Sequence, residues 1–231
     1  MNHQKMSDIW QLGYRVYDAD NGIPQLFLLR DNNMNYLAHL HIAQLCESEL
    51  TGNLAADFIR GKPEGKFPEK TVNAIYLHRF VDRFIDNLPE TKYCRQHFSK
   101  DLYRFSAIAL DIFWDHILAI DWDNYHSLDL EQFVENCRVR CNEEKQHIPQ
   151  LPTSYLTTAE RMWQNDWLLS YRKRETIALV LERMSHRSPR MAPLRDCAAE
   201  INVHYELFHE QFSGIYKQVQ HAALAFNETR T

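Results

Sequence analysis

Apolar residues recur at helical spacing along most of the chain. From Met34 onward, segments whose apolar positions fall three and four residues apart follow one another, separated by short polar connectors. The connectors carry Gly and Pro, as at 61–65 (GKPEG) and 188–189 (SP), and these residues end helices. The predicted helices cover residues 35–46, 50–60, 68–86, 90–98, 100–120, 130–146, 154–170, 174–186 and 192–225. The pattern predicts an all-α fold, a bundle of roughly eight or nine helices.

Residues 1–33 differ from the rest of the chain. They show no sustained helical period, and a turn-forming stretch at 18–24 precedes a short apolar run. Two interpretations stay open. Either the segment is a short irregular or hairpin-like appendage, or translation begins at Met34 and residues 1–33 are an upstream extension. The expected organisation is an N-terminal extension, 1–33, followed by a single helical domain, 34–231.

Histidine, aspartate and asparagine recur four residues apart inside segments that otherwise consist of core-type residues. This spacing places two side chains on one face of a helix, one turn apart. Carboxylates are rarely buried unless they are paired or bind a metal ion. The pairs are Asn35 with His39, Asn53 with Asp57, His78 with Asp82, Asp82 with Asp86, and Asp111 with Asp115, which His116 follows at once.

A metal site between facing helices would explain these pairs together, because helix bundles hold ions with inward His and carboxylate side chains. Imidazole nitrogen and carboxylate oxygen are ligands of Mn²⁺, Fe²⁺ and Zn²⁺, and the absence of cysteine from the set favours a harder ion, Mn²⁺. The alternative is a structural network of buried polar groups without an ion. The residues expected at the metal are His39, Asp57, His78, Asp82, Asp115 and His116.

Composition and charge narrow the class of protein. The 231 residues, 45% of them hydrophobic, suffice for one domain with a large core. No apolar run reaches the ~18 residues of a membrane span and no signal-peptide pattern opens the chain, so we expect a cytoplasmic protein without a membrane partner. The net charge of −5 gives no support to nucleic-acid binding. The five cysteines, odd in number, are expected to be reduced thiols.

One stretch departs from the overall acidic balance. Between Tyr171 and Asp196, seven basic residues stand against three acidic ones, a local charge of +4. The stretch is either a solvated helix face or a docking surface for an acidic partner. The sequence contains no Gly-rich phosphate loop, no G-x-S-x-G and no H-E-x-x-H motif, which argues against several common hydrolytic and nucleotide-binding chemistries.

An ordered set of five motifs runs through the chain: MNYLAHLHIAQL (34–45), TGNLAADFIRG (51–61), LHRFVDRFIDNLPE (77–90), LDIFWDHILAIDW (110–122) and RMSHRSPRM (183–191). In order and in spacing this set resembles the bacterial acyl-carrier-protein phosphodiesterases, over residues 34–221. The resemblance implies a helical bundle of HD-like type, dependence on Mn²⁺, and hydrolysis of the phosphodiester that joins 4′-phosphopantetheine to a serine of holo acyl carrier protein. The family's polar positions fall on His39, Asn53, Asp57, His78, Arg79, Asp82, Asp86, Asp111, Asp115 and His116.

Two features depart from the family pattern. Members of the family begin near Met34, and the His-Asp order of ordinary HD proteins is reversed in Asp115-His116. The first departure leaves the role of residues 1–33 open, and the second leaves open which ligands correspond to the HD set.

The resemblance leads to a mechanistic hypothesis in which each polar residue has a role. Asn53, Asp86 and Asp111 are expected beside the metal ligands, with the two aspartates orienting the imidazoles. Arg79 is the first choice for the phosphate oxygens and Arg187 the second, and His39 or His116 would protonate the serine leaving group. The docking surface for the acidic carrier protein would comprise Arg60, Lys62, Arg183 and Arg190, with Lys66 nearby.

Two alternatives to this function stay open on the sequence. One is an HD-like hydrolase of nucleotides or other small phosphoesters, and the other is a non-catalytic helical binding protein. Metal content separates the binding protein from both hydrolases, and a comparison of holo acyl carrier protein with a panel of nucleotides separates the two hydrolases. The oligomeric state is left open.

Overall fold

A computed structural model of the protein describes residues 36–230, so the expectations for residues 1–33 fall outside it. Its α-helices are α2 (Tyr36–Leu45), α3 (Leu50–Ala55), α4 (Glu69–Asn87), α5 (Pro89–Arg95), α6 (Ser106–Ile120), α7 (Leu130–Glu144), α8 (Thr153–Gln164), α9 (Trp167–Ser170), α10 (Glu175–Ser185), α11 (Cys197–Val203) and α12 (Tyr205–Glu228). Short 3₁₀ segments are η1 (Ala56–Phe58), η2 (Tyr103–Phe105), η3 (Trp122–Asn124), η4 (Lys145–His147) and η5 (Pro189–Asp196). No strand occurs in residues 36–230, and the prediction of an all-α fold is confirmed.

Two of the predicted helices are divided into separate α-helices. The segment predicted at 154–170 breaks into α8 and α9 at Asp166, which has φ 49°. Aspartate tolerates this left-handed conformation better than most residues. The segment predicted at 192–225 breaks into η5, α11 and α12, with His204 between the two helices at φ −105° and ψ 18°. The breaks at Asp166 and His204 are not marked by Gly or Pro, so the pattern of turn residues did not reveal them, whereas Pro193 lies within η5.

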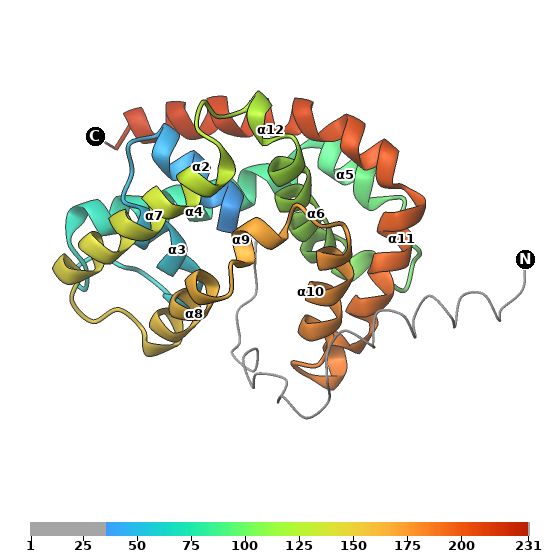
Figure 1. The fold of residues 1–231 in the computed structure, drawn as a ribbon, viewed down its shortest axis with the longest axis horizontal. Coiled ribbons are helices and arrows are strands. Elements are labelled where there is room, and N and C mark those ends of the chain that lie inside the picture. Colours follow the sequence, from blue (N-terminus) through green and yellow to red (C-terminus); the bar gives the residue numbers. More distant parts are fainter. Residues whose placement is uncertain (1–35, 231) are drawn as a thin grey trace, which may run out of the picture.

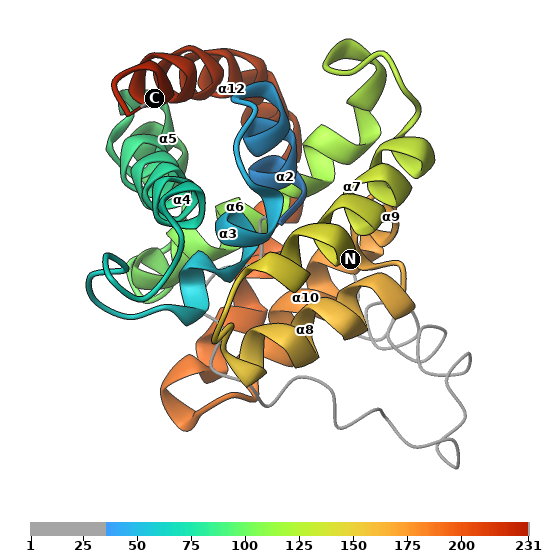
Figure 2. The same ribbon diagram turned by 90° about the vertical axis from the view of Figure 1, so that its left-hand side faces the viewer.

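Helix α12 runs along one side of the molecule and covers the helices that carry the polar pairs (Figure 1). It contacts α2, α4, α5 and α6, and Figure 2 shows α2, α4 and α5 beneath it. Helix α6 is the most deeply placed of these, since every residue from Ile112 to Ala119 is buried. Polar residues on the inner faces of α2, α4 and α6 therefore lie away from bulk water.

A glycine sets the distance between α3 and α4. A Cβ atom at Gly52 would lie 2.7 Å from the Cβ of Ala74 and 3.1 Å from the carbonyl oxygen of Thr71, both on α4. Separations below about 3 Å are repulsive for carbon atoms, because optimal contacts lie near 3.5–4.0 Å. The absence of a side chain at Gly52 thus lets α3 pack closely on α4 and brings η1, which follows α3, beside the middle of α4.

Two of the features expected from composition, membrane spans and cysteines, can be compared with the described helices. None of them is both long and apolar enough to cross a membrane. All five cysteines are buried free thiols. Burial raises the pKa of Cys137 to about 12, which keeps the thiol in its unreactive protonated form.

Candidate metal centre

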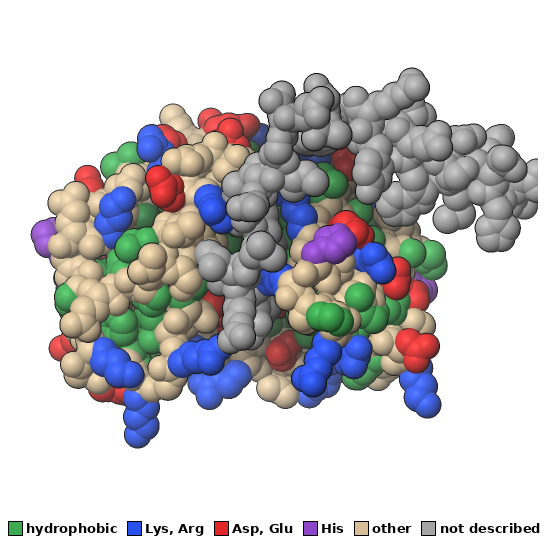
Figure 3. All heavy atoms as spheres, turned by 90° about the horizontal axis from the view of Figure 1, so that it is seen from below, with side chains coloured by type: hydrophobic (Ala, Val, Ile, Leu, Met, Phe, Trp, Pro, Cys, Tyr) green, Lys and Arg blue, Asp and Glu red, His purple; other side chains and the backbone are tan. Residues whose placement is uncertain are grey.

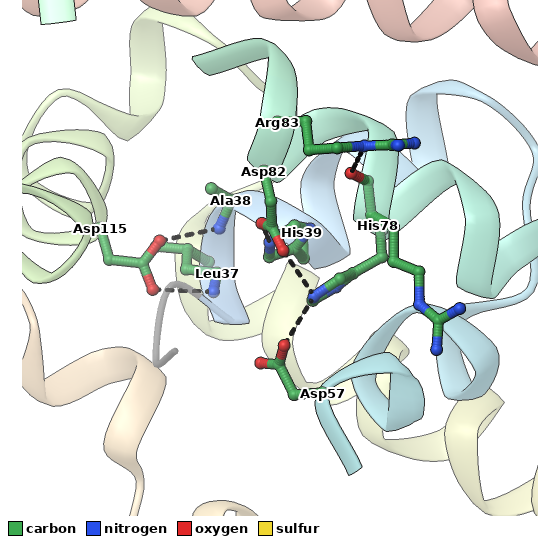
Figure 4. A network of polar contacts seen from close by, with 9 residues as sticks. Leu37, Ala38, His39, Asp57, His78, Asp82, Arg83 and Asp115 are labelled. Carbon is green, nitrogen blue, oxygen red and sulfur yellow. Dashed lines mark hydrogen bonds and ion pairs between the residues drawn. The ribbon is translucent and has the colours of Figure 1, made fainter. Parts of the chain in front are cut away.

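Four of the predicted site residues meet where α2, η1 and α4 come together (Figure 4). His39 of α2 lies with its Nε2 3.0 Å from Oδ1 of Asp82 on α4. The Nε2 of His78, also on α4, lies 3.2 Å from Oδ2 of the same Asp82 and 3.1 Å from Oδ1 of Asp57 on η1. Asp82 therefore bridges the two imidazoles, and Asp57 approaches the second of them from the opposite side.

The two histidines also stack on each other. Their ring centroids are 3.8 Å apart with an interplanar angle of 18°, and both residues are 1% exposed. Burial, followed by the charge of His78, lowers the pKa of His39. Burial by itself would lower the pKa of His78, but the carboxylates of Asp82 and Asp57 outweigh it and raise that pKa to about 10. Although burial opposes the charged form of Asp82, His78 and His39 hold its pKa well below the usual range.

His39, His78 and Asp82 form a group that fits a metal ion. Each offers a ligand atom, and these atoms all lie within 4.8 Å of one another. Two imidazoles and a carboxylate suit a first-row divalent metal ion. Such an ion would take the place of the protons that hydrogen-bond the same atoms to one another.

Buried polar atoms around the group support this fit. Nδ1 of His39, Nδ1 of His78 and Oδ2 of Asp57 are buried and have no hydrogen-bond partner among residues 36–230. An unsatisfied buried polar atom costs about 1–3 kcal/mol, and such atoms in a native fold usually mark a ligand, an ion or water. Asp57 would be satisfied by the same cation that the triad binds.

Further carboxylates surround the group. Burial is the largest cause of the raised pKa of Asp111 on α6, and the charges of Asp82, Asp86, Asp115 and Asp57 raise it further. Burial likewise raises the pKa of Asp86 on α4, with Asp82 acting in the same direction. These effects indicate that Asp86 and Asp111 lie near Asp82, and the role of the two aspartates in orienting the imidazoles stays a prediction. A divalent cation would relieve the repulsion between these carboxylates.

Asp115 has a different environment from the one expected of a ligand. Its Oδ2 accepts a hydrogen bond from the amide of Leu37 at 3.0 Å, and its Oδ1 accepts one from the amide of Ala38 at 2.9 Å. Burial raises the pKa of Asp115 to about 8, although both amides act to lower it. The residue joins α6 to the first turn of α2, and so fixes the backbone that carries His39.

His116 likewise lies outside the cluster. Its Nδ1 donates to the carbonyl oxygen of Tyr171 at 2.6 Å, and its Nε2 accepts from the hydroxyl of Tyr205 at 2.7 Å. Both ring nitrogens are used, and burial lowers the pKa of the imidazole. The ring is therefore a neutral connector between α6, the residue after α9, and α12.

Two other expected positions also have local structural partners. The side-chain amide of Asn53 donates to Ser48 Oγ at 3.0 Å and to the carbonyl oxygen of Glu49 at 2.9 Å. Arg79, expected at the phosphate, donates instead to the carbonyl oxygens of Gly61, at 2.8 Å, and Ile59. Asn53 thus stabilises the start of α3, and Arg79 holds the loop after η1. Asn35, the first residue of the pairs, lies outside the described residues.

The basic residues predicted to bind the partner form two groups along the chain, one that closely follows Asp57 and one that is far from every residue of the cluster. Arg60 and Lys62 are exposed on the loop after η1, and Arg183 and Arg190 are exposed at the end of α10 and in η5, with Arg187 half-buried between them. Figure 3 views the molecule from the side of α8 and α10, and shows Lys and Arg side chains along one edge of that face.

The spacing argument overlooked one arginine near the cluster. Arg95 of α5 lies close enough to Asp86 for its charge to lower the pKa of that carboxyl, against the larger effect of burial. Arg95 stands in the polar run TKYCRQH, where an arginine is unremarkable. Only the packing of α5 against α4 reveals its position.

Comparison with known proteins gives the same family as the motifs of the sequence. A family model described as acyl carrier protein phosphodiesterase matches residues 34–219. A protein of that name from Klebsiella pneumoniae subsp. pneumoniae is 39% identical over 194 residues, covering 82% of this chain and 97% of the relative. One from Shigella boydii serotype 18 is 38% identical over 199 residues, covering 83% and 100%. No solved structure matches. The resemblance seen in the motifs is confirmed.

Proposed function

The chain belongs to the acyl carrier protein phosphodiesterase family of enzymes, and we propose that it uses a divalent metal ion, held by His39, His78 and Asp82, to cleave its substrate. The bond cleaved is the phosphodiester between 4′-phosphopantetheine and a serine of holo acyl carrier protein. The products are apo acyl carrier protein and 4′-phosphopantetheine.

The convergence of His39, His78 and Asp82 is the observation that carries the metal proposal. A phosphodiester resists attack because its negative charge repels a nucleophile, and the transition state concentrates more charge on the oxygens. A divalent ion supplies Lewis-acid stabilisation of that charge and makes water a stronger nucleophile near neutral pH. The set of imidazole and carboxylate donors without a thiolate favours Mn²⁺.

The surrounding residues hold these three ligands in place. Asp57 Oδ1 lies 3.1 Å from the same Nε2 of His78, so its carboxylate would contact the bound ion beside this ring. Asp115 anchors the first turn of α2 through the amides of Leu37 and Ala38, and so positions His39. Asp86 and Asp111 add negative charge beside the ligands, which favours a cation at this position over water.

Two roles from the sequence hypothesis are not retained. Because both ring nitrogens of His116 are bonded to Tyr171 and Tyr205, we give it neither a metal nor a general-acid role. Because Arg79 donates to two backbone carbonyls, its role in the proposal is to fix the loop that follows Asp57. The HD-like type of the bundle stays a prediction.

The acidic carrier protein would dock on the basic residues at the end of α10 and in η5. Arg183 and Arg190 are exposed there, and Arg60 and Lys62 offer further positive charge on the loop after η1. Charge complementarity of this kind increases the rate of encounter more than it strengthens the final contact.

One assay tests the reaction and its metal together. Purified protein is incubated with holo acyl carrier protein in Mn²⁺ or in excess chelator, and intact-mass spectrometry follows the loss of phosphopantetheine. We expect apo acyl carrier protein only when metal is present. Undiminished turnover in chelator, with no metal found by elemental analysis, would refute the metal centre. Turnover of nucleotides but not of the carrier protein would refute the substrate.

A further inference from the structure

The proposed reaction needs a cation to bind the phosphate oxygens, and the arginine expected from the sequence is already engaged. The terminal nitrogens of Arg79 donate to the carbonyl oxygens of Gly61 and Ile59. Arg83 donates through Nε to the carbonyl oxygen of Arg79 at 3.0 Å, and its guanidinium extends away from His39 and Asp82 (Figure 4). Neither side chain is aimed at the candidate metal centre.

Arg95 is held in place by contacts that leave its terminal nitrogens available. Its Nε donates to Oγ of Ser106 at 3.0 Å, and that hydroxyl donates to the carbonyl oxygen of Tyr103 at 2.7 Å. The guanidinium carbon lies 5.0 Å from the centroid of the Tyr103 ring, within the range of a cation–π interaction. Neither terminal nitrogen forms a hydrogen bond or ion pair with a described residue. One edge and one face of the group are thus fixed, and the outer edge is free.

Arg95 lies near Asp86, which is on the same helix as the metal ligands His78 and Asp82. Asp86 follows Asp82 by one helical turn on α4, about 5.4 Å along the axis. Helix α5 packs against α4, and the charge of Arg95 reaches Asp86. The two side chains nevertheless form no ion pair within 4.0 Å. A fixed, half-buried cation therefore lies near Asp86, one helical turn from Asp82, and no carboxylate of residues 36–230 is bound to it.

We propose that Arg95 binds the non-bridging oxygens of the substrate's phosphodiester, with Ser106 and Tyr103 as its positioning residues. The proposal rests on the proposed function, because the phosphate must lie beside His39, His78 and Asp82. A guanidinium presents parallel N–H donors in a planar fork that matches phosphate oxygens. A side chain already fixed by Ser106 and Tyr103 loses little conformational entropy when the anion binds.

The first test compares the Mn²⁺-loaded wild-type protein with Arg95→Gln on two substrates, holo acyl carrier protein and bis(p-nitrophenyl) phosphate. We expect kcat/KM to fall roughly 10- to 100-fold on both, the loss of a charged hydrogen bond. Arg104→Gln is the matched control, because its guanidinium also lies over a ring, 4.5 Å from the centroid of Phe105. Arg95→Lys should recover only part of the activity, and added guanidinium ion should partly restore Arg95→Gly.

A second readout does not depend on turnover. Calorimetric titration of the Mn²⁺-loaded protein with inorganic phosphate should show weaker binding to Arg95→Gln than to the wild-type protein and Arg104→Gln, with Mn²⁺ affinity unchanged. Equal phosphate binding in all three proteins would overturn the proposal, even if hydrolysis of the carrier protein fails for another reason. A loss on the carrier protein alone would also overturn it and make Arg95 a docking residue. If Arg95→Gln does not fold, Ser106→Ala, which frees the guanidinium to move, should weaken phosphate binding, and an unchanged affinity would overturn the proposal.

Discussion

The imidazoles of His39 and His78 lie face to face, with their centroids 3.8 Å apart. Two protonated rings at this distance would repel each other. Burial, followed by the charge of His78, lowers the pKa of His39, whereas the carboxylates of Asp82 and Asp57 raise the pKa of His78. Asp82 contacts both rings. When both rings are neutral, the two imidazoles and the carboxylate of Asp82 carry one negative charge together, and a divalent ion would compensate it.

Removing either imidazole should abolish tight metal binding. We expect His39→Gln and His78→Gln to lose stoichiometric Mn²⁺ in elemental analysis and to lose hydrolysis of holo acyl carrier protein. Asp57→Asn should keep the metal with roughly 10- to 100-fold lower affinity, because the amide removes a negative charge beside the cation and leaves the three other ligands in place. His97→Gln, outside the cluster, is the control. Full metal content in both histidine variants would show that the ion binds elsewhere.

Substitution of Asp115 should lower the stability of the fold more than it lowers the binding of the metal ion. Asp115→Ala leaves the amides of Leu37 and Ala38 without their acceptor, and each unsatisfied buried group costs about 1–3 kcal/mol. Urea unfolding should therefore show a lower free energy of unfolding, while saturating Mn²⁺ still binds in stoichiometric amount. Loss of all metal from folded Asp115→Ala would instead make Asp115 a ligand.

The buried imidazole of His41 should make the fold less stable at acidic pH. Burial, followed by the charge of His126, lowers the pKa of His41 to about 4, and its Nδ1 lies 2.6 Å from the hydroxyl of Tyr216. The unfolded chain takes up this proton near pH 6.5, so stability falls as pH drops from about 6.5 to about 4, by up to roughly 3 kcal/mol.

The variant His41→Gln isolates this contribution. Its free energy of unfolding should depend less on pH than that of the wild-type protein across the window from about 6.5 to about 4. His147→Gln, at an exposed position, should retain the wild-type dependence. Parallel profiles for all three proteins would contradict the assignment to His41.

Substitution of the exposed arginines at the end of α10 and in η5 should change the hydrolysis of the protein substrate and leave that of a small phosphodiester unchanged. We expect the double variant Arg183→Ala, Arg190→Ala to raise KM for holo acyl carrier protein roughly two- to tenfold, because exposed charges contribute on the order of 0.2–1 kcal/mol each. The KM of the double variant should also depend less on salt concentration than that of the wild-type protein. Hydrolysis of bis(p-nitrophenyl) phosphate should not change. Arg138→Ala, which removes an exposed pair with Glu135 on α7, is the control, and equal losses on both substrates would assign these arginines to the fold.

Removal of residues 1–33 should leave catalysis intact. The family model begins its match at residue 34, and all the proposed ligands follow that position. Protein that begins at Met34 should hydrolyse holo acyl carrier protein with unchanged kcat and bind the same amount of Mn²⁺. A folded but inactive truncated protein would make the segment part of the enzyme.

The helical pattern predicted the elements well, and three of the six residues expected at the metal, His39, His78 and Asp82, form a group that could hold an ion. Periodicity shows which residues share a face of one helix, but it does not show which neighbouring helix that face meets. His78 and Asp82 face α2, whereas Asp115 on α6 meets the backbone of α2 instead of its side chains.

The directions of adjacent side chains further limit which residues can bind one metal ion, and this limit follows from the sequence alone. Consecutive side chains on an α-helix are about 100° apart, because 3.6 residues make one turn. Asp115 and His116 therefore diverge, the first to α2 and the second to Tyr171 and Tyr205. Arg95 shows the opposite case, since nothing in its sequence neighbourhood distinguishes it and only the contact of α5 with α4 does.

The close contact at Gly52 makes the enzyme vulnerable at a residue that touches neither metal nor substrate. An alanine there would place its Cβ 2.7 Å from that of Ala74, and the resulting displacement of α3 would be passed along η1 to Asp57. The substitution could produce a folded protein with every ligand present and hydrolysis impaired. The cause of such a defect would not be found among the residues that contact metal or phosphate. The size of the side chain that position 52 accepts without loss of activity therefore measures how closely α3 and α4 must approach for catalysis.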